Sequence, residues 1–535
     1  MYSECLPFTR IPHTTKLFLD FLYDFPRVQR FYAHPPQSLS WVNEQAAQVD
    51  YDSARRERVA AILDRQNRAF GASPKTLESI ERFRRGAYVA VTGQQVGFLG
   101  GPLFSVLKAL TAVRIAVQAT QSGVPCVPVF WLATEDHDLE EVKPAVLQDS
   151  DGALHTLAID TEGPQGASIA HIRVAEASAA VVQEAATLLA DPEVAQWVKD
   201  AYKPGIPLGQ AFGTLFARIF SDSGVVLLDA ADPELHAIAA PVYMNAIREA
   251  GELDSALISR GRELHGAGYH EQVKVTESST LLFGTADRAR TPIQRANGGF
   301  VLGREKLELQ ELLSRITAKP EDFTPNVLLR PVVQDYLLPS IAYSGGPAEV
   351  AYFAQAGVVF ERLLGHLTPV LPRFSATVVD ARAKRILQRY GLGLADLFHG
   401  PDVLRQEIAS RSLPDELQAK LDGAKRVVSE ALENVVAPLT KLDPTLIRSA
   451  ERASNKMQYQ LDRLRRRAAS AELRKNEIIE RHAERLSTAL FPHKDLQERV
   501  IAGVSLLGQQ GVGVLETLQE AALSGCLDHQ IIYLT

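Results

Sequence analysis

The densest group of ionisable side chains, Glu135-Asp136-His137-Asp138, directly follows an apolar stretch at residues 125–132. If that stretch is a strand of a parallel sheet, these side chains lie at the edge that faces the ligand crevice. We predict that His137 is a general base toward an amine or hydroxyl, with Asp136 or Asp138 orienting its ring. Two alternatives stay open. Glu135, Asp136 and Asp138 could hold Mg²⁺ through water, or the segment is a solvated loop in which an Asp caps a short helix.

A glycine-rich turn at residues 92–102 joins a predicted strand to a predicted helix. Free backbone N–H groups and the helix dipole at such a turn favour a phosphate or a carboxylate. We therefore predict that Gly93, Gln94, Gln95 and Gly97 bind an anionic ligand. The glycine spacing is that of neither the dinucleotide fingerprint nor the P-loop, and the glycines could instead serve only the turn and its packing.

A third polar cluster spans residues 327–349, where another strand runs into two glycines and a helix start. Arg330 can bind a carboxylate bidentately, and the N–H groups near Gly345 and Gly346 offer a second anion position. Alternatively, Arg330 and Asp335 form a structural ion pair and the two glycines form a turn. The predicted binding residues of this cluster are Arg330, Tyr343, Gly345, Gly346 and Glu349.

A parallel sheet would bring the three clusters together. Apolar strand patterns lie at residues 87–92, 125–132, 225–229, 340–343 and 369–371, and a helical pattern at 102–118 connects the first two. Strand, helix and strand at this spacing form a βαβ unit, so we predict an α/β fold with a parallel-sheet core. Two stretches, 147–174 and 279–302, have the pattern of antiparallel hairpins inserted between core units, and we expect them to cover the substrate.

The pattern changes from residue 417 onward. Apolar residues repeat by four and then three over 417–435 and again over 446–471, with a proline break between, which is typical of a coiled coil. The second helix is predicted to run from 444 to 490, and the hairpin to pair with a second copy of the chain. The predicted domains are a core at 1–380 with insertions near 145–200 and 265–325, a coiled-coil arm at 381–490, and a C-terminal segment at 491–535 that returns to the core.

Composition fits a water-soluble protein of more than one part: the chain has 535 residues, of which 46% are hydrophobic and 23% charged. The formal net charge of −7 argues against general polyanion binding, and the basic run at 463–467 is predicted to be a solvated face, so no nucleic-acid partner is expected.

Cysteine usage and the chain start bear on the compartment. Cys5, Cys126 and Cys526 are scattered and lack CxxC spacing, so neither a disulfide framework nor a cysteine-based zinc site is expected. The first residues lack a signal-peptide pattern and no run of about 18 apolar residues occurs, so we predict a cytoplasmic protein with no membrane partner.

Three long segments, TGQQVGFLGGPLFSVLKA, PVFWLATEDHDLEEV and LRPVVQDYLLPSIAYSGGPAEVAYFAQ, together with the late coiled coil, resemble the bacillithiol-biosynthesis cysteine-adding enzyme family, the BshC cysteine ligases. The resemblance spans nearly the whole chain. It implies a Rossmann-like core related to nucleotidyltransferases and class I aminoacyl-tRNA synthetases, connecting-peptide-like insertions, and a coiled-coil arm used for homodimerisation. It also implies the joining of L-cysteine to the amine of glucosaminyl-malate, and a nucleotide site near the arm to which no residue here is assigned.

The sequence departs from class I synthetases, because it has neither a clean HIGH-type nor a clean KMSKS-type signature; Gly100-Gly101-Pro102 with Lys108 occupies the corresponding place. We predict a carboxylate–amine ligase in which His137 deprotonates the amine, Asp136 assists it, and Gln94, Gln95 and the Gly93 turn bind phosphate or the malate carboxylates. ATP or ADP is the expected nucleotide, Mg²⁺ is a candidate ion, and no resident metal is assigned. The alternatives are a nucleotidyltransferase or aminoacyl-adenylate-forming enzyme, and a non-catalytic coiled-coil scaffold.

Overall fold

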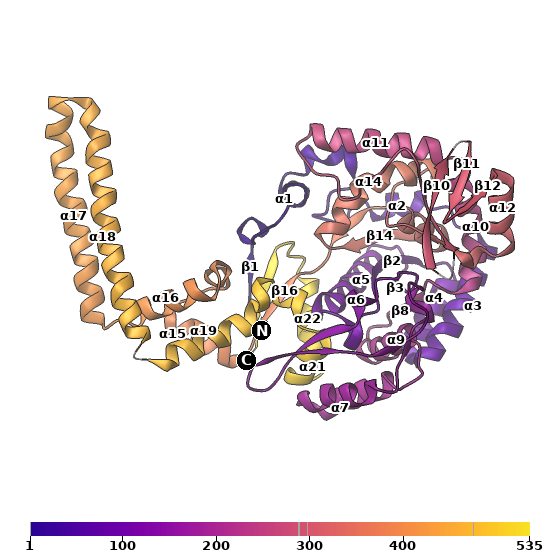
Figure 1. Cartoon of the computed structure of the whole chain (residues 1–535), viewed down its shortest axis with the longest axis horizontal. Coiled ribbons are helices and arrows are strands. Elements are labelled where there is room, and N and C mark those ends of the chain that lie inside the picture. Colours follow the sequence, from indigo (N-terminus) through magenta and orange to yellow (C-terminus); the bar gives the residue numbers. More distant parts are fainter. Residues whose placement is uncertain (1, 287–288, 297, 475, 535) are drawn as a thin grey trace. The chain divides into compact units, whose positions relative to one another are not determined.

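The computed structural model describes residues 2–286, 289–296, 298–474 and 476–534. The chain divides into two compact units (Figure 1). The larger unit consists of Ser3–Thr377 and Glu498–Ile532. The helical unit consists of Val378–Gln497 with a few residues from each end of the chain.

A five-stranded parallel sheet, in the order β15-β14-β2-β3-β8, organises the larger unit. Its strands are β2 (Tyr88–Gln94), β3 (Cys126–Leu132), β8 (Val226–Asp229), β14 (Ser340–Gly345) and β15 (Val370–Pro372). Every residue of β3 and β14 is buried, as expected for strands that are covered on both faces. The predicted α/β class and Rossmann-like parallel core are confirmed, and the carboxyl ends of the strands meet at one edge.

Helices cover this sheet. The helix α5 (Leu103–Gln121) follows the glycine-rich turn and packs on β2, β3 and β14, while α3 (Ser53–Phe70) and α4 (Pro74–Arg84) pack on β8 and β3. α5 is also the one described helix that is long and apolar enough to cross a membrane, and most of it is buried inside the unit. The other main helices of the larger unit are α1 (Lys16–Tyr23), α2 (Val42–Gln48), α3 (Ser53–Phe70), α4 (Pro74–Arg84), α6 (Leu139–Val142), α7 (Ser178–Leu188), α8 (Pro192–Ala201), α9 (Leu208–Ile219), α10 (Pro233–Arg248), α11 (Ala250–Gly266), α12 (Leu309–Ala318), α13 (Arg330–Leu337), α14 (Pro347–Leu364), α21 (Gly503–Gln510) and α22 (Val514–Leu523).

The two inserted stretches form antiparallel strands. The first contains the pair β4 (Pro144–Gln148) and β5 (Leu154–Ala158) and the short pair β6 (Thr161–Glu162) and β7 (Arg173–Val174). The second is larger than the predicted hairpin and forms a five-stranded sheet in the order β12-β11-β10-β9-β13. Its strands are β9 (Ser279–Ala286), β10 (Ala289–Ala296), β11 (Gly299–Leu302), β12 (Glu305–Leu307) and β13 (Phe323–Pro325).

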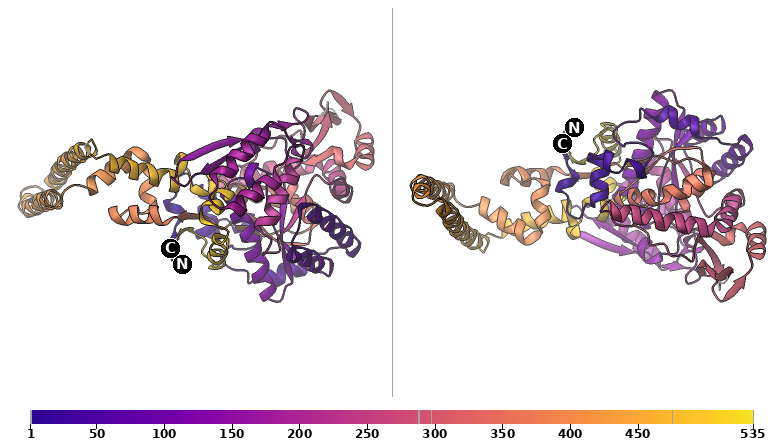
Figure 2. Two further views of the ribbon diagram at one scale, coloured as in Figure 1. Left: turned by 90° about the horizontal axis from the view of Figure 1, so that it is seen from below. Right: turned by 90° about the horizontal axis from the view of Figure 1, so that it is seen from above.

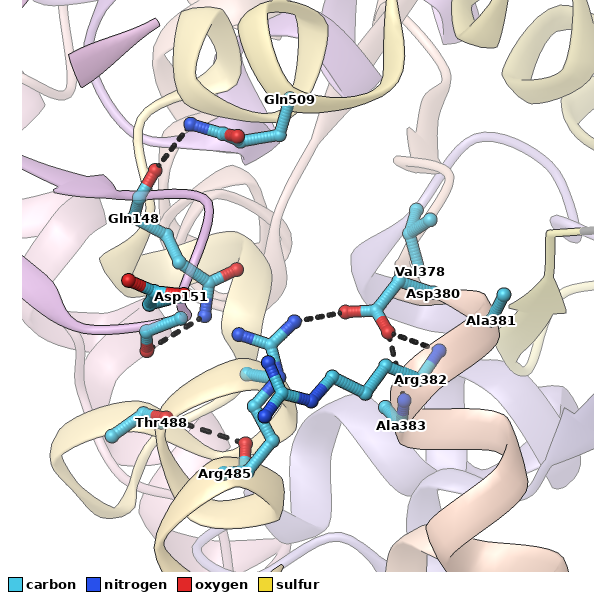
Figure 3. Close-up of polar contacts among 12 residues, drawn as sticks. Gln148, Asp151, Val378, Asp380, Ala381, Arg382, Ala383, Arg485, Thr488 and Gln509 are labelled. Atoms are coloured by element: carbon cyan, nitrogen blue, oxygen red, sulfur yellow. Dashed lines mark hydrogen bonds and ion pairs between the residues drawn. The ribbon is translucent and has the colours of Figure 1, made fainter. Parts of the chain in front are cut away.

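The C-terminal segment 498–532 is anchored within the larger unit. The N–H of Leu103 donates to the carbonyl of Ile501 (2.8 Å), and the N–H of Ala502 donates to the carbonyl of Val146 (2.9 Å). The amide of Gln509 donates to the carbonyl of Gln148 (2.8 Å; Figure 3). The start of α5 and the strand β4 therefore fix the position of this segment.

The helical unit contains a long antiparallel hairpin of α17 (Asp415–Leu442) and α18 (Ile447–Leu473), which lie side by side in Figures 1 and 2. Asp422 pairs with Arg465 and Lys425 pairs with Asp462, so the two helices run in opposite directions. α15 (Ala381–Tyr390), α16 (Pro401–Arg411) and α19 (Glu477–Leu490) complete the unit. A predominantly helical coiled-coil region is thereby confirmed.

One predicted helix is wrong in extent. The segment 444–490 is not continuous, because α18 ends at Leu473 and α19 begins after Asn476. Asn476 has non-helical backbone angles (φ −132°, ψ 88°), and its side chain accepts a hydrogen bond from the N–H of Ile478. This is an N-cap, which starts a new helix. An ion pair between Arg485 and Asp380 holds α19 to α15 (Figure 3). Asp380 is also the N-cap of α15.

The cysteine prediction also needs a correction. Cys5 and Cys526 are paired as a disulfide, whereas the sequence indicated no pairing. Both lie in the larger unit, where the fold brings the first strand and the C-terminal segment together. Cys126 is free and buried in β3, as expected of an apolar core residue.

Candidate functional site

A cavity of about 650 Å³ lies in the larger unit at the carboxyl edge of the parallel sheet. Residues from the ends of β2, β3 and β14 line it, together with the start of α14 and the antiparallel sheet. Its lining includes Gly93, Gln94, Gln95, Phe104, Lys108, Trp131, Glu135, Asp136, Phe283, Arg290, Asn326, Arg330, Tyr343, Gly346, Glu349, Tyr352, Arg373 and Arg499. This edge is where ligands bind in open α/β sheets.

Lys108 and Glu349 form a buried ion pair on the cavity wall. The ammonium of Lys108 lies 2.7 Å from the carboxylate of Glu349 and also donates to the carbonyl of Gly93 (2.8 Å) and the side chain of Gln94 (2.9 Å). Glu349 accepts a further hydrogen bond from the N–H of Gly346 (2.7 Å). Burial would raise the pKa of Glu349, but Lys108 outweighs it and holds that pKa below its usual range. The pair therefore ties β2, α5 and α14 together.

Arg330 is a partly buried residue at the first turn of α13. It donates to the hydroxyl of Tyr352 (2.7 Å) and to the side chain of Gln334 (3.2 Å), and it lies over the ring of Tyr343, 5.6 Å from the centroid. In the described part of the chain, no carboxylate lies within 4.0 Å of it. The alternative ion pair with Asp335 is not formed, because Asp335 accepts from the hydroxyl of Thr368 instead.

Glu135 is a buried residue of the cavity lining. Its carboxyl lies 3.5 Å from the imidazole Nε2 of His236, whose Nδ1 lies 3.1 Å from the hydroxyl of Tyr243. Burial raises the pKa of Glu135 to about 8, although Arg290 and Arg330 oppose the shift. Burial also lowers the pKa of His236 to about 4. Both groups are therefore mainly neutral at pH 7, and the contact between them is not an ion pair.

Asp136 joins the turn after β2 to the antiparallel sheet. Its carboxylate accepts from Gln95 (2.8 Å) and from the N–H of His137 (2.8 Å), and it lies 3.7 Å from the guanidinium of Arg290. Burial would raise the pKa of Asp136, but these partners hold it below its usual range. Arg290 also stacks on Phe283, 3.9 Å from the ring centroid, and donates to the carbonyl of Pro325 (3.0 Å).

The structure separates the predicted residues into two groups. Those that line the cavity are Gly93, Gln94, Gln95, Glu135, Asp136, Arg330, Tyr343, Gly346 and Glu349. Those outside its lining are Gly97, His137, Asp138 and Gly345. The side chain of His137 is 45% exposed, and Asp138 caps α6 by accepting from the N–H of Glu141 (3.2 Å).

The glycines of the turn have packing roles. A Cβ at Gly93 would lie 3.0 Å from Trp131 in the neighbouring strand, and a Cβ at Gly97 would lie 3.0 Å from the Cα of Gly101. The N–H of Gly97 already donates to the carbonyl of Gln95 (3.0 Å). Gly97 therefore serves the turn, which agrees with the alternative that the sequence left open.

Sequence reasoning missed several cavity residues, above all Trp131, Arg290, Tyr352, Arg373 and Arg499. Arg373 directly follows the strand β15, so the rule that located Glu135 could also have located it. Arg290 and Arg499 carry no such signal, because the docking of the antiparallel sheet and of the C-terminal segment brings them to the cavity.

Two further features bear on metal and anion binding. In the described ranges, no group of three His, Cys, Asp or Glu side chains is arranged to hold a metal ion. A smaller cavity of about 280 Å³ in the helical unit is lined by Arg405, Glu480 and Glu484 among others. Arg405 pairs with Asp402 and Glu480, so the charge there does not favour a polyphosphate.

Comparisons with known proteins agree along the whole chain. Residues 1–374 match the family model described as "Bacillithiol biosynthesis BshC, N-terminal Rossmann-like domain", and residues 376–534 match "Bacillithiol biosynthesis BshC, C-terminal coiled-coil domain". A protein of Koribacter versatilis is 46% identical over 99% of this chain and 100% of its own length. A protein of Solibacter usitatus is 34% identical over 99% of this chain and 100% of its own length. Both carry the name "Putative cysteine ligase BshC".

A solved structure from Campylobacter jejuni, whose title reads "putative arginyl t-RNA synthetase", covers 88% of this chain and 98% of its own at 9% identity. Its TM-score of 0.23 is too low to support an argument.

Proposed function

Because the chain belongs to the BshC family of bacillithiol biosynthesis, we propose that it is a ligase that forms an amide between the carboxyl group of L-cysteine and the amine of glucosaminyl-malate. The relatives' printed name supports a ligase that uses cysteine. The acceptor and the bond formed are the finer part of the proposal, and they depend on the chemistry of the cavity.

Arg330 is the observation that carries the proposal. A partly buried guanidinium that faces a cavity and makes its side-chain hydrogen bonds to neutral groups favours an anionic ligand, because no carboxylate of the described residues lies within 4.0 Å of it. Three other cations of the cavity already have carboxylate partners: Lys108 with Glu349, Arg290 with Asp136, and Arg373 with Glu498. The malyl group of the acceptor has two carboxylates, of which one suits Arg330.

The amine must lose its proton before it attacks, since only the free amine is nucleophilic. Glu135 suits this role because it lines the cavity and its pKa of about 8 is close to that of an amino sugar's ammonium group. The ionised form of Glu135, which predominates only above a pH of about 8, would take the proton as the C–N bond forms. The bond to the leaving group on the cysteine carbonyl then breaks, and the leaving group keeps the electron pair. His137, the predicted base, would need to reach the amine from outside the cavity lining.

The cysteine carboxyl needs activation, because a carboxylate and an ammonium ion do not condense readily in water. A nucleoside triphosphate would supply the leaving group. The lining of the large cavity fits an anionic group, since cationic side chains predominate there. We therefore propose ATP as co-substrate and assign no residue to its base or its phosphates.

The test is product formation by the purified chain from L-cysteine, glucosaminyl-malate and ATP, followed by mass spectrometry with each component omitted in turn. We expect the amide product only in the complete mixture, and little of it with Arg330→Gln. Absence of product from the folded wild-type chain would reject the proposal. Cysteine-dependent pyrophosphate exchange without amide formation would instead favour an aminoacyl-adenylate-forming enzyme.

A further inference from the structure

Glu498, in the C-terminal segment, is a fully buried carboxylate next to the cavity. One of its oxygens accepts from the guanidinium of Arg373 (2.5 Å) and from the hydroxyl of Ser375 (2.8 Å), and the other accepts from the N–H of Ala376 (2.8 Å). Burial would raise the pKa of Glu498, but Arg373 and these donors hold it below its usual range. Its negative charge is therefore stabilised where it lies.

Arg373 is fixed on three sides. Besides Glu498, one of its terminal nitrogens donates to the carbonyl of Phe374 (3.0 Å), and the guanidinium lies over the ring of Phe104, 5.4 Å from the centroid. The N–H of Arg373 donates to the carbonyl of Gly345 at the end of β14 (2.8 Å). Its side chain is only 7% exposed, yet it lines the cavity.

A guanidinium has five N–H donors in a planar fork, so an arginine with two such hydrogen bonds keeps donors for a ligand. Both guanidinium groups lie near Glu349: a Cβ at Gly346 would lie 3.5 Å from Nε of Arg373 and 3.6 Å from the Glu349 carboxylate. Glu349 also accepts from the hydroxyl of Tyr343, over whose ring Arg330 lies. Two guanidinium groups near each other match the two carboxylates of a malyl group.

From these contacts we propose that Arg373 binds a carboxylate of the substrate, and that Glu498 is a positioning residue that holds the Arg373 guanidinium in the orientation for binding. The proposal rests on the proposed function for the identity of the substrate. It assigns part of the binding site to the segment 498–532, which lies more than a hundred residues beyond the rest of the site in the sequence.

Steady-state kinetics of Arg373→Gln, Arg373→Lys, Glu498→Gln and the double variant Arg373→Gln/Glu498→Gln test the proposal. We expect Arg373→Gln to raise KM for glucosaminyl-malate about 10- to 100-fold, and Arg373→Lys to restore part of the loss. Glu498→Gln should raise the same KM several-fold with a smaller change in kcat and little change in KM for cysteine. The double variant should be no weaker than Arg373→Gln, because Glu498 acts through Arg373.

Glu516→Gln is the matched control, since Glu516 is an exposed glutamate of the same segment. If Glu498→Gln does not fold, Ser375→Ala removes one hydrogen bond to Glu498 and should raise the same KM by a smaller factor. Additive effects, or a lower melting temperature with unchanged KM, would make Glu498 merely structural. If the Arg373 variants raise only the KM for ATP, Arg373 binds a phosphate of ATP, and the assignment of Arg373 to a substrate carboxylate is overturned.

Failure of this inference can be distinguished from failure of the proposed function. A wild-type chain that makes no amide product rejects the function itself. A wild-type chain that makes the product, while the Glu498 and Ser375 variants keep their KM values, rejects only the positioning role.

Discussion

The carboxyl group of Glu135 and the imidazole of His236 lie 3.5 Å apart, and burial keeps both mainly uncharged at pH 7. The folded chain thus holds a proton on Glu135 up to a pH of about 8, whereas the unfolded chain releases it near the ordinary glutamate pKa of 4.5. Between these values the folded state binds more protons, so the contribution of Glu135 to stability falls as the pH rises.

Glu135→Gln should therefore remove a pH dependence. We expect the wild-type melting temperature to fall relative to that of Glu135→Gln from about pH 5 to pH 8, with an upper bound of about 4 kcal/mol on the difference in unfolding free energy. The same variant should lose roughly 10²–10⁴-fold in turnover if Glu135 is the base. If the melting temperatures of the wild type and of Glu135→Gln differ by the same amount at every pH, the raised pKa of Glu135 is contradicted. If Glu135→Gln keeps full turnover and His137→Gln loses most of it, His137 and not Glu135 is the general base.

Arg330→Gln should weaken binding of the anionic substrate. The variant removes a charge-assisted contact, so KM for glucosaminyl-malate should rise about 10- to 100-fold, and Arg330→Lys should lie between the two. Arg315→Gln is the control, because Arg315 is a surface arginine paired with Glu305 and Glu311. A lower melting temperature without any change in KM would give Arg330 a structural role only.

Trp131→Phe should change stability and binding in opposite directions. The indole N–H of Trp131 is buried at the cavity and has no hydrogen-bond partner within the described residues. Losing this unpaired donor should leave the free protein as stable or slightly more stable, and should weaken a ligand that accepts the hydrogen bond about 5- to 10-fold. Trp41→Phe, which removes a donor paired with Pro35, should instead lower the melting temperature. Unchanged calorimetric affinity for Trp131→Phe would show that the ligand does not use this donor.

The hairpin of α17 and α18 should mediate dimerisation. Val427 is 60% exposed and Leu464 is 56% exposed, so the hairpin alone leaves apolar surface in water. Val427→Gln with Leu464→Gln should shift the mass measured by light scattering from dimer to monomer. The neighbouring Arg426→Gln should leave it unchanged. A monomeric wild-type chain, or a double variant that remains dimeric, contradicts the prediction.

The sheet and its functional edge were predictable because local patterns encode them. Buried strands read as apolar runs, and polar residues that follow such runs, such as Gln94 and Glu135, meet at one edge of a parallel sheet. The same reasoning could not decide which of two polar residues close together in the sequence lines the cavity. His137 and Glu135 are two residues apart, but the buried one lines the cavity and the other is half exposed.

Other features depend on contacts between distant segments. The disulfide of Cys5 with Cys526 and the ion pair of Arg373 with Glu498 exist only because the C-terminal segment returns to the larger unit. The helix break at Asn476 did have a local signal, an Asn followed by an acidic residue, which the heptad pattern obscured.

Because Glu498 supplies the counter-charge of Arg373, the order of synthesis on the ribosome matters. All five strands of the parallel sheet have been made once Pro372 has left the peptidyl-transferase centre, but the partner of Arg373 is added 125 residues later. At about 5–20 residues per second, the nascent chain carries this arginine without its counter-charge for roughly 6–25 s. The larger unit therefore cannot finish folding during translation until the helical unit has been synthesised, and a chain that stalls in between lacks Arg499 in the cavity lining and the counter-charge of Arg373.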